Sequence, residues 1–265
     1  MACCMTVRNC AQYLPRLFQN INRLRTLFNE FTLIVAYDNC IDDSERLLKE
    51  FQMRSSFPVH LLKIDNPSTQ RTVRIANARN ACLEKLETLD VHTHFMIDAD
   101  DVNVEPWNIR LLRYYLGRND WEVLTFNRKD YYDIWALMYH PFQHHCWGFY
   151  EHSHDVIPHM KKDIVSKLEH CKEWVPCQSA FNGFGMYKTH LFKGLRYDGE
   201  YKNLHKMIPD VSRQNTLNAL SSLGLPIRLD TTPYNESCEH LYYHLSAISQ
   251  KTPASIYQNI TLLNP

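Results

Sequence analysis

The chain has 265 residues and a formal net charge of +0, because 29 lysines and arginines balance 29 aspartates and glutamates. Balanced charge gives no electrostatic reason to bind nucleic acid or an anionic membrane, so we expect neither partner. No stretch approaches the roughly 20 apolar residues that a membrane-spanning helix needs, and we expect no membrane span. A chain of this length suits one large α/β domain with a sizeable core.

The nine cysteines are scattered along the chain, and none belongs to a Cys-x-x-Cys pair. No signal peptide is recognisable before the first apolar run, so we do not expect the disulfide framework of a secreted protein. We therefore expect reduced thiols and a cytoplasmic protein.

The first half of the chain alternates strand-like and helix-like segments. Short apolar runs predict strands at residues 2–7, 31–37, 59–64 and 93–97. Apolar residues at helical spacing predict helices at residues 11–28, 44–52 and 72–89. Such alternation is typical of an α/β fold with a mostly parallel sheet, helices on both faces, and ligands bound at the carboxyl ends of the strands.

The pattern changes after Val104 and becomes mixed. The predicted elements are, in order, a helix at 106–116, a strand at 121–128, its antiparallel partner at 131–137, a helical excursion within 140–172, a helix at 213–223 and a short strand at 227–230. A glycine-rich turn lies at residues 181–185. The sequence contains no linker and no internal repeat, so we expect one nucleotide-type half joined to one mixed half.

The predicted strand at residues 93–97 ends in three carboxylates within four positions, Asp98, Asp100 and Asp101. Carboxylates this close repel one another unless a positive charge lies between them, and a hard divalent cation is the usual partner. A cation held by few protein ligands keeps coordination positions free for phosphate oxygens. The pattern predicts a site for a divalent cation and a diphosphate, with a solvated acidic turn as the alternative.

Charged residues also adjoin the other strand ends. Arg8 follows the first strand and Asp38 follows the second, while Arg71, Arg74 and Arg79 open the helix before the acidic strand. A helix N-terminus rich in arginine suits an anionic diphosphate. An acid after the second strand suits a nucleobase or a ribose hydroxyl. For Arg71 and Arg74, an ordinary solvated helix face is the alternative.

Seven motifs follow one another along the chain. They are Val-Arg-Asn, Tyr-Asp-Asn-x-x-Asp-Asp-Ser, Arg-Thr-x-Arg-Ile-Ala-x-Ala-Arg-Asn, Asp-Ala-Asp-Asp-Val, Phe-Asn-Arg-x-x-Tyr-Tyr-Asp-Ile-Trp-Ala-Leu, Phe-Asn-Gly-Phe and Cys-Glu-His. The ordered series closely resembles nucleotide-sugar glycosyltransferases of the GT-A fold, and it spans roughly residues 5–247. More specifically, it resembles a small GT-A group found in large DNA viruses and some microbes.

This resemblance implies a single GT-A domain over residues 1–265, with a nucleotide-sugar-binding half at 1–103 and an acceptor-binding half at 104–265. It implies a glycosyltransferase that uses Mn²⁺ or Mg²⁺ and moves a sugar from a UDP- or GDP-linked donor to a hydroxyl of a glycan or glycoprotein. If the chain is viral, the setting is the host cytoplasm and the acceptor is a glycan of a capsid protein. Inverting and retaining chemistry both stay open.

The resemblance also implies roles for residues that match its motifs. The expected donor-binding residues are Arg8, Asp38, Arg71, Arg74, Arg79, Asn80, Asp98 and Asp101. The expected metal ligands are Asp98 and Asp100 with a C-terminal histidine, either His240 or His244. An extended segment would point both histidines to the same face.

An inverting reaction also needs a carboxylate that deprotonates the acceptor hydroxyl. The candidates for this base are Asp133, Asp198, Glu200, Glu236 and Glu239. Glu239 is favoured because it adjoins the expected metal-ligand segment. The expected acceptor-binding residues are Arg128, Asp133, Asn182 and Gly183. Aromatic residues at 131–135 suit stacking on sugar rings, although Trp135 suits the core equally well.

Two other functions remain as alternatives. A nucleotidyltransferase acting on sugar phosphates shares the sheet and the cation, but such enzymes carry a glycine-rich loop after the first strand, where residues 7–10 contain no glycine. The second alternative is a non-catalytic module that binds nucleotide sugars or glycans. The presence of Asp98, Asp100 and Arg79 argues against it, because such a module would not need all three residues. A dinucleotide-dependent dehydrogenase is disfavoured, because no Gly-x-Gly-x-x-Gly follows any predicted strand.

Overall fold

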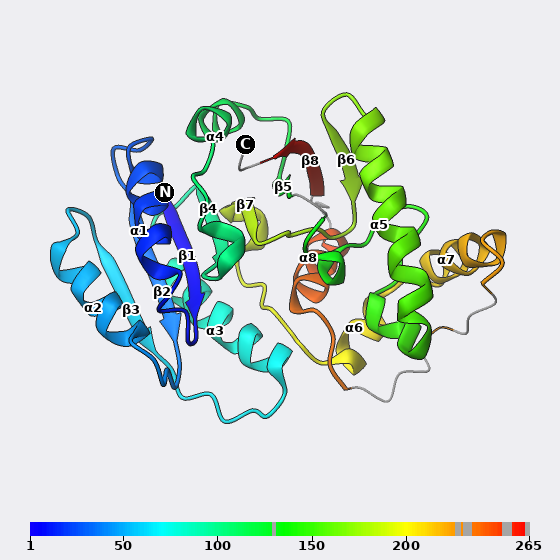
Figure 1. Ribbon diagram of the computed structural model, residues 1–265, viewed down its shortest axis with the longest axis horizontal. Helices are drawn as coiled ribbons and strands as arrows, with labels where there is room; N and C mark the ends of the chain where they lie inside the picture. Colours follow the sequence, from blue (N-terminus) through cyan, green and yellow to red (C-terminus); the bar gives the residue numbers. More distant parts are fainter. Residues whose placement is uncertain (129–130, 226–228, 230–234, 251–255, 263–265) are drawn as a thin grey trace.

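The computed structural model describes residues 1–128, 131–225, 229, 235–250 and 256–262. Through them runs one eight-stranded sheet in the order β3-β2-β1-β4-β7-β5-β8-β6 (Figure 1). The strands are β1 Ala2–Val7, β2 Thr32–Tyr37, β3 Val59–Lys63, β4 Thr93–Asp98, β5 Val123–Asn127, β6 Trp174–Cys177, β7 Phe184–Lys188 and β8 Ile256–Leu262.

Strands β3, β2, β1 and β4 form a parallel half of the sheet. Val7 lies opposite Tyr37 and Thr6 lies opposite Asp98, so the carboxyl ends of β1, β2 and β4 meet at one edge. Beyond β4 the sheet is mixed. Strand β7 pairs antiparallel with β4 and β5, β8 runs parallel to β5, and β6 runs antiparallel to β8.

Helices cover both faces of the sheet, because alternate strand residues point to opposite sides. Cys3 and Met5 of β1 pack in a core with α1, α2 and α4, whereas Ala2 and Cys4 pack in a core with α3, α6 and α8. The helices are α1 Leu14–Arg25, α2 Ser44–Arg54, α3 Arg71–Leu86, α4 Ile109–Leu116, α5 Ser153–His170, α6 Tyr201–Met207, α7 Asp210–Ser222 and α8 Glu239–Ser249. The predicted α/β class, a mostly parallel sheet flanked by helices with a smaller mixed region, is confirmed.

Helix α1 shows how the sequence pattern produces this packing. Its buried residues Leu14, Leu17, Ile21 and Leu24 recur every three or four positions and form one apolar stripe. Burying each of these side chains contributes on the order of 1.5–3 kcal/mol. Pro15 stands in the first turn, where its missing N–H costs no hydrogen bond.

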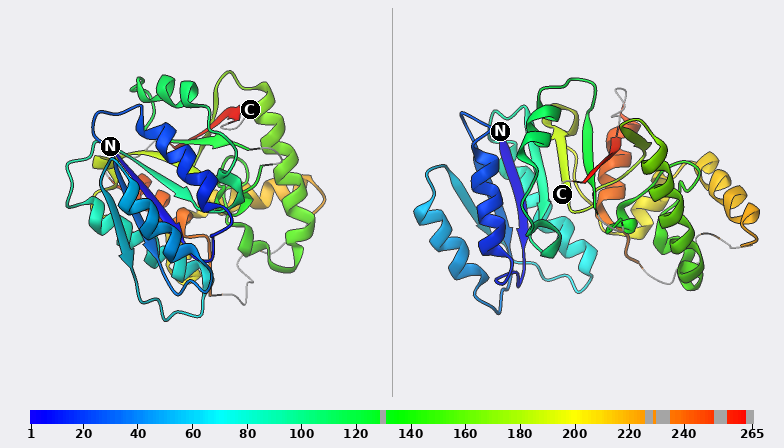
Figure 2. Two further views of the ribbon diagram at one scale, coloured as in Figure 1. Left: turned by 60° about the vertical axis from the view of Figure 1, so that its left-hand side comes forward. Right: turned by 45° about the horizontal axis from the view of Figure 1, so that its top comes forward.

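Helices α5 and α7 lie at the opposite end of the molecule from β3 and α2 (Figures 1 and 2). Val156, Met160, Ile164 and Leu168 of α5 pack with Leu220 of α7 in a third core. The predicted helical excursion is thereby confirmed, with the 3₁₀ turn η3 Cys146–His152 leading into α5. Among the described helices, including the 18-residue α5, none combines the length and apolar character that a bilayer crossing requires.

The prediction of an antiparallel strand at residues 131–137 is wrong. The segment contains the 3₁₀ turn η2 Ile134–Ala136, and the antiparallel neighbour of β5 is β7. In a strand Tyr132, Ile134 and Ala136 would share one face of the sheet, yet Tyr132 is exposed whereas Ile134 and Ala136 are buried. Tyr131 also has a φ of 45°, which lies outside the strand region.

The prediction of an extended segment around the C-terminal histidines is also wrong. The segment is the helix α8, in which His240, Leu241, His244 and Leu245 are buried. Leu241 and Leu245 are four residues apart, a spacing that indicates a helix. His240 and His244 are also four residues apart, so their spacing fits a helix as well as a strand. The short strand predicted at 227–230 lies outside the described residues, apart from Leu229.

Candidate active site

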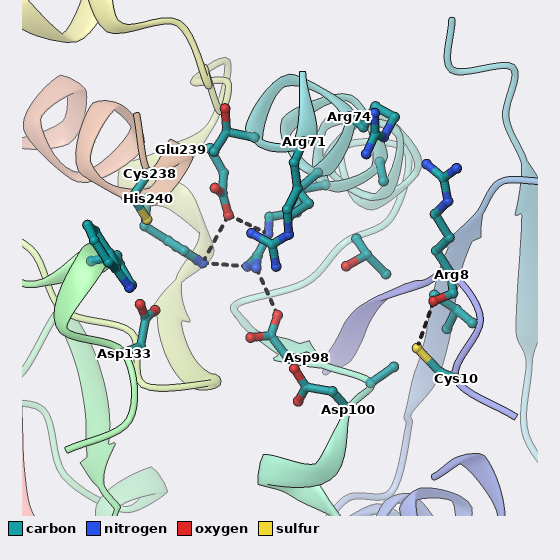
Figure 3. A pocket seen from close by; sticks show the side chains of 18 of the residues that line it. Arg8, Cys10, Arg71, Arg74, Asp98, Asp100, Asp133, Cys238, Glu239 and His240 are labelled. Atoms are coloured by element: carbon teal, nitrogen blue, oxygen red, sulfur yellow. Dashed lines mark hydrogen bonds and ion pairs between the residues drawn. The ribbon is translucent and has the colours of Figure 1, made fainter. Parts of the chain in front are cut away.

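A cavity of about 570 Å³ lies at the edge of the sheet where β1, β2 and β4 end (Figure 3). Parallel α/β sheets bind ligands at this edge. Ten of the predicted site residues line the cavity, namely Arg8, Asp38, Arg71, Arg74, Arg79, Asp98, Asp100, Asp133, Glu239 and His240. The fold therefore brings together residues from both halves of the chain.

Arg79 of α3 lies at the centre of the charged groups in this cavity. Its guanidinium is 2.8 Å from Oδ1 of Asp98 and 3.1 Å from Oε1 of Glu239, and its side chain is only 4% exposed. The rings of Phe181 and Tyr197 lie 4.6 Å and 5.5 Å from the guanidinium carbon. Burial alone lowers the pKa of Arg79, but Glu239 and Asp98 raise the pKa above its ordinary value, so the group is charged.

His240 accepts a hydrogen bond from Arg79 through Nε2. Because a guanidinium only donates, Nε2 carries no proton in this contact. Burial lowers the pKa of His240 well below its usual value, and the Arg79 charge lowers it further, so the imidazole is neutral. The ring stacks on Phe181 with the centroids 3.7 Å apart. The lone pair that a metal ligand would use is therefore directed at Arg79.

Asp98 and Asp100 form an acidic pair at the end of β4. Oδ1 of Asp100 is buried and has no hydrogen-bond partner among the described residues, and Oδ2 accepts a hydrogen bond of 3.4 Å from the Tyr132 hydroxyl. Burial raises the pKa of Asp100 to about 7, and the charges of Asp98 and Asp101 add to this effect. Asp101 begins the 3₁₀ turn η1 Asp101–Asn103; it is exposed and does not line the cavity.

The acidic pair fits a hard divalent cation, but the predicted third ligand, His240 or His244, does not fit the site. Two neighbouring carboxylates and a buried oxygen without a partner are the donor set that Mg²⁺ or Mn²⁺ prefers. No group of three His, Cys, Asp or Glu side chains within the described part of the chain has the spacing of a metal site. Asp98 and Asp100 are therefore the two carboxylates of the cavity that could hold a cation.

Three arginines line one side of the cavity, Arg8 after β1 and Arg71 and Arg74 in the first turn of α3 (Figure 3). Arg8 lies 3.7 Å from the buried carboxylate of Asp38. Arg74 donates hydrogen bonds to backbone carbonyl oxygens of the loop before α3, and Arg71 is exposed. We call these three residues the arginine wall. Such a concentration of positive charge favours an anionic ligand.

The start of α3 is fixed by residues that are distant in the sequence. Oε2 of Glu236 accepts hydrogen bonds of 3.0 Å from both the backbone N–H and the hydroxyl of Thr72. The Gly199 carbonyl oxygen lies 2.9 Å from the same hydroxyl and shares its single proton with Glu236, and a Cβ at Gly199 would lie 2.4 Å from the Thr72 carbonyl carbon. Glu236, a candidate base, thus holds the helix that carries Arg71 and Arg74 and does not line the cavity.

Asp133 enters the cavity from the loop before η2. Its backbone N–H donates to Oδ1 of Asn182, 2.9 Å away, and its own Oδ1 accepts a bond from the Ala136 N–H. Burial raises the pKa of Asp133 to about 7, Asp98 and Glu239 raise it further, and Arg79 opposes them. A carboxylate with a pKa near neutrality suits general base catalysis.

Two other predicted residues hold the chain together outside the cavity wall. Asn80 donates to the backbone oxygen of Tyr197 and accepts from its N–H, at 2.9 Å and 2.8 Å. Asp198 accepts hydrogen bonds of 2.7 Å from the Glu200 N–H and from the Asn203 side chain. Glu200 itself lies in an isolated bridge with Glu236. These contacts position backbone and leave the side chains away from the cavity.

His244 also lies away from the cavity. Its ring is fully buried and shares hydrogen bonds with the hydroxyls of Ser179 and Tyr187, at 2.9 Å and 3.1 Å. Burial lowers the pKa of His244 to about 3, so the imidazole is neutral. The structure thus places His244 in a polar cluster of the core, one helical turn from His240.

The predicted acceptor residues Arg128, Asn182 and Gly183 lie outside the cavity wall, next to the end of β4. Arg128 is buried and donates to the Asn182 carbonyl oxygen and to Oδ1 of Asn103. Burial lowers the pKa of Arg128 to about 10. The Gly183 carbonyl accepts the Asp98 N–H, and the φ of 82° at Gly183 suits glycine. These residues support the cavity without lining it.

Sequence reasoning missed several residues that line the cavity, among them Cys10, Trp147 and Cys238. Trp135, which suited the core equally well, lines the cavity with 40% of its surface exposed. Trp147 lies in a histidine-rich stretch without a recognisable motif, and only the packing of η3 brings it here. Tyr132, one of the aromatic residues expected to suit sugar stacking, also lines the cavity.

Comparison with known proteins gives similarity at the level of structure. No family model and no curated protein matches the chain. Residues 1–349 of TarS from S. aureus match 82% of this chain and 54% of their own, at 11% identity and a TM-score of 0.44. The mannosyltransferase PcManGT from Pyrobaculum calidifontis, in complex with GDP-Man and Mn²⁺, matches 74% of this chain and 47% of its own, at 10% identity and a TM-score of 0.45.

Glucosyl-3-phosphoglycerate synthase from Mycobacterium tuberculosis matches 84% of this chain and 66% of its own, at 11% identity and a TM-score of 0.41. The chain thus spans about half the length of the first two structures. Similarity at this level concerns the fold, and the chemistry of the site rests on the chain's own residues.

Proposed function

We propose that the protein is a metal-dependent glycosyltransferase that moves a sugar from a UDP- or GDP-sugar to a hydroxyl of a glycan acceptor. One observation carries this proposal. A single cavity at the carboxyl ends of parallel strands combines the arginine wall with the acidic pair Asp98 and Asp100. A nucleoside diphosphate needs positive charge for its phosphates and, in most transfer reactions, a divalent cation beside its leaving oxygen.

The nucleotide half of the donor would lie over residues 1–103. Arg8, Arg71 and Arg74 would bind the diphosphate, whose negative charge would balance the positive charge of these three side chains. Asp38, buried at the end of β2, would accept hydrogen bonds from the base or the ribose. Because Glu236 fixes the first turn of α3, the arginines approach the phosphates from a rigid support.

The cation site would consist of Asp98 and Asp100, with Mn²⁺ or Mg²⁺ as the metal. When bound, the ion supplies Lewis-acid stabilisation of the charge that develops on the departing diphosphate. Burial raises the pKa of Asp98, while Arg79 opposes this rise and orients the carboxylate through their 2.8 Å ion pair. His240 and Glu239 in turn hold Arg79, so we assign them positioning roles and not a place among the metal ligands.

Asp133 is the base that we propose for an inverting reaction. Both carboxylates line the cavity, but Glu239 is committed to the Arg79 ion pair, whereas Asp133 accepts a hydrogen bond from the Ala136 N–H. Asp133 would take the proton of the acceptor hydroxyl as its oxygen bonds to the anomeric carbon. The bond from that carbon to the diphosphate oxygen breaks, and the diphosphate leaves with the electron pair. A retaining reaction would not use this base.

The acceptor half would lie over residues 104–265, and the resemblance to viral GT-A enzymes favours a protein-linked glycan, such as one on a capsid protein, made in the cytoplasm. The donor is tested by thermal unfolding of the purified protein with UDP- and GDP-sugars, with and without Mn²⁺. Ligands that bind only the folded state raise its melting temperature. We expect one nucleotide class to raise it, and more so with Mn²⁺. No shift with any donor or metal would reject the proposal.

A matched variant makes this experiment specific. Arg71→Ala removes a charge of the arginine wall, whereas Arg110→Ala removes another exposed arginine, which lies on α4 outside this cavity. The shift should shrink in the first variant and stay unchanged in the second. Equal loss in both would indicate non-specific attraction of nucleotides.

A further inference from the structure

A second cavity, of about 610 Å³, lies between the end of α1 and the start of α4, and its lining includes Arg23 of α1 and Arg110 and Arg113 of α4. We call these three residues the α1–α4 arginines. Helix α1 begins after the carboxyl end of β1 and ends before the amino end of β2, so this cavity lies at the opposite edge of the parallel strands from the active-site cavity. In Figure 1, α4 lies at the top, whereas β1 runs downward from the N-terminus. Among the described residues, the two cavities have no lining residue in common.

The positive charge of this cavity is not balanced by the described residues. The α1–α4 arginines are exposed, and none of them forms an ion pair with a described residue. Elsewhere, Arg46 and Arg196 pair with glutamates at 2.6 Å and 2.7 Å. Glu105, shortly before the start of α4, lies 3.6 Å from Arg16 instead, and the cavity lining contains no described Asp or Glu. Like charges around one cavity repel one another, and an anion between them removes this repulsion.

The cavity also offers hydrogen-bond donors that lack acceptors. Trp107 lines it and is only 1% exposed, and its indole Nε1 has no partner among the described residues. An indole N–H only donates, so this atom needs an acceptor. The Asn108 side chain caps α4 by accepting the Leu111 N–H. The N–H groups of Ile109 and Arg110, in the first turn, have no acceptor within the helix, and such a helix start favours an anion.

From these observations we infer that the cavity is a second anion site, which binds a phosphate group through the α1–α4 arginines and the start of α4. A phosphate monoester carries about −1.5 to −2 charges and three terminal oxygens, so it accepts hydrogen bonds from several guanidinium groups at once. A carboxylate offers one charge and two oxygens, and satisfies this cavity less fully. The phosphate belongs either to a soluble ester or to a lipid headgroup, which share the same chemistry.

This site is separate from the proposed donor site and does not rest on the proposed function. Since its lining contains no described carboxylate, the cavity offers no ligand for Mn²⁺ or Mg²⁺. Nucleotide binding that depends on Mn²⁺ therefore reports on the active-site cavity alone. Arg110→Ala should lose phosphate bound at the second site and keep the Mn²⁺-dependent nucleotide shift.

The test follows the indole N–H resonance of Trp107 by NMR of the ¹⁵N-labelled protein, with Trp107→Phe to assign the resonance. The probes are inorganic phosphate and glycerol 3-phosphate, exchanged for chloride at constant ionic strength, with glycerol as the uncharged comparison. The melting temperature in the same solutions is a second readout, because a ligand of the folded state raises it. We expect a phosphate probe to move the resonance and raise the melting temperature, and glycerol to do neither.

Variants locate the binding. Arg23→Ala and Arg113→Ala should weaken the response to phosphate by at least about fivefold, because each removes a charged donor. Arg71→Ala, in the arginine wall, and Arg54→Ala, an exposed arginine of α2 outside both cavities, should respond as the wild type does. A response lost in Arg71→Ala but kept in Arg113→Ala would place the phosphate in the active-site cavity. Equal losses in Arg54→Ala and Arg113→Ala would indicate non-specific attraction, and either result would overturn the inference.

Vesicles distinguish the two sources of phosphate. Co-sedimentation is measured with phosphatidylcholine vesicles that contain or lack phosphatidic acid, for the wild type and Arg113→Ala. A response to the soluble probes supports a soluble ester as the ligand. Binding that requires phosphatidic acid and Arg113, without a response to the soluble probes, supports a lipid headgroup. If neither the soluble probes nor phosphatidic acid bind, the inference is rejected.

Discussion

Arg79 and Asp98 form an ion pair of 2.8 Å between the guanidinium and the first carboxylate at the end of β4. Arg79 also binds Glu239 and His240 at the start of α8, so one side chain joins α3, β4 and α8. These three elements come from distant parts of the chain, and they enclose the cavity in which the acidic pair and the arginine wall lie. The pair is therefore both a structural link and part of the electrostatics of the site.

Removal of Arg79 should destabilise the protein. In Arg79→Ala, Asp98 and Glu239 lose their partner while remaining in a site of low exposure, which costs about 3–5 kcal/mol in comparable cases. The free energy of unfolding, measured with urea, should fall by that amount. Arg71→Ala, an exposed residue of the same helix, should change it by less than about 0.5 kcal/mol. Equal losses in the two variants would contradict the role of the buried network.

The arginine wall should determine nucleotide affinity. Arg74→Ala and Arg71→Ala should each weaken UDP or GDP binding about 10- to 100-fold, because a charge-assisted hydrogen bond contributes roughly 1.5–3 kcal/mol. Titration calorimetry measures the effect, with Arg110→Ala as the control. Affinity of the wild type should also fall as salt rises, because ions screen exposed charges. Unchanged affinity in both variants would place the phosphates elsewhere.

The activity should depend on the ionisation of Asp133. Its pKa is raised to about 7 by burial, by Asp98 and by Glu239, while Arg79 lowers it. Only the ionised carboxylate accepts a proton, so kcat/KM should be level above pH 7 and fall about tenfold per pH unit below it. Asp133→Asn should abolish this acid limb along with most of the activity. Asp198→Asn, a residue outside the cavity, should keep the wild-type profile. An acid limb that survives in Asp133→Asn would show that another group, Asp100 or a different base, controls the activity.

His240 should not determine metal affinity. Its Nε2 faces Arg79, so His240→Gln, whose side-chain oxygen still accepts a hydrogen bond, should retain the Mn²⁺ concentration that gives half of the donor-induced thermal shift. Asp100→Asn should raise that concentration at least tenfold, because it removes a carboxylate from the acidic pair. If His240→Gln loses the Mn²⁺ response as fully as Asp100→Asn, His240 is a ligand after all and Arg79 must move when metal binds.

The parallel half of the fold and most of the cavity could be predicted from the sequence. Strand–helix alternation places Arg8, Asp38 and Asp98 at the same edge of the sheet, because parallel strands share their direction. The contact between Arg79 and His240 could not be predicted, since the two residues are 161 positions apart. His240 also lies in a helix, whereas the spacing of His240 and His244 fits an extended segment equally well. The 3₁₀ turn that brings Trp135 to the cavity could not be predicted either, because the aromatic residues at 131–135 suit a strand equally well.

The central claim is that the acidic pair and the arginine wall act together on a nucleotide sugar. The most direct measurement is the release of UDP or GDP from a set of UDP- and GDP-sugars by the wild type and by Asp100→Asn, with and without Mn²⁺. Transfer to water suffices as the reaction, so the acceptor need not be known. We predict Mn²⁺-dependent release from one donor class by the wild type, and at least a hundredfold loss in a folded Asp100→Asn protein. Equal release by both proteins, or none by the wild type with any donor, would contradict the claim.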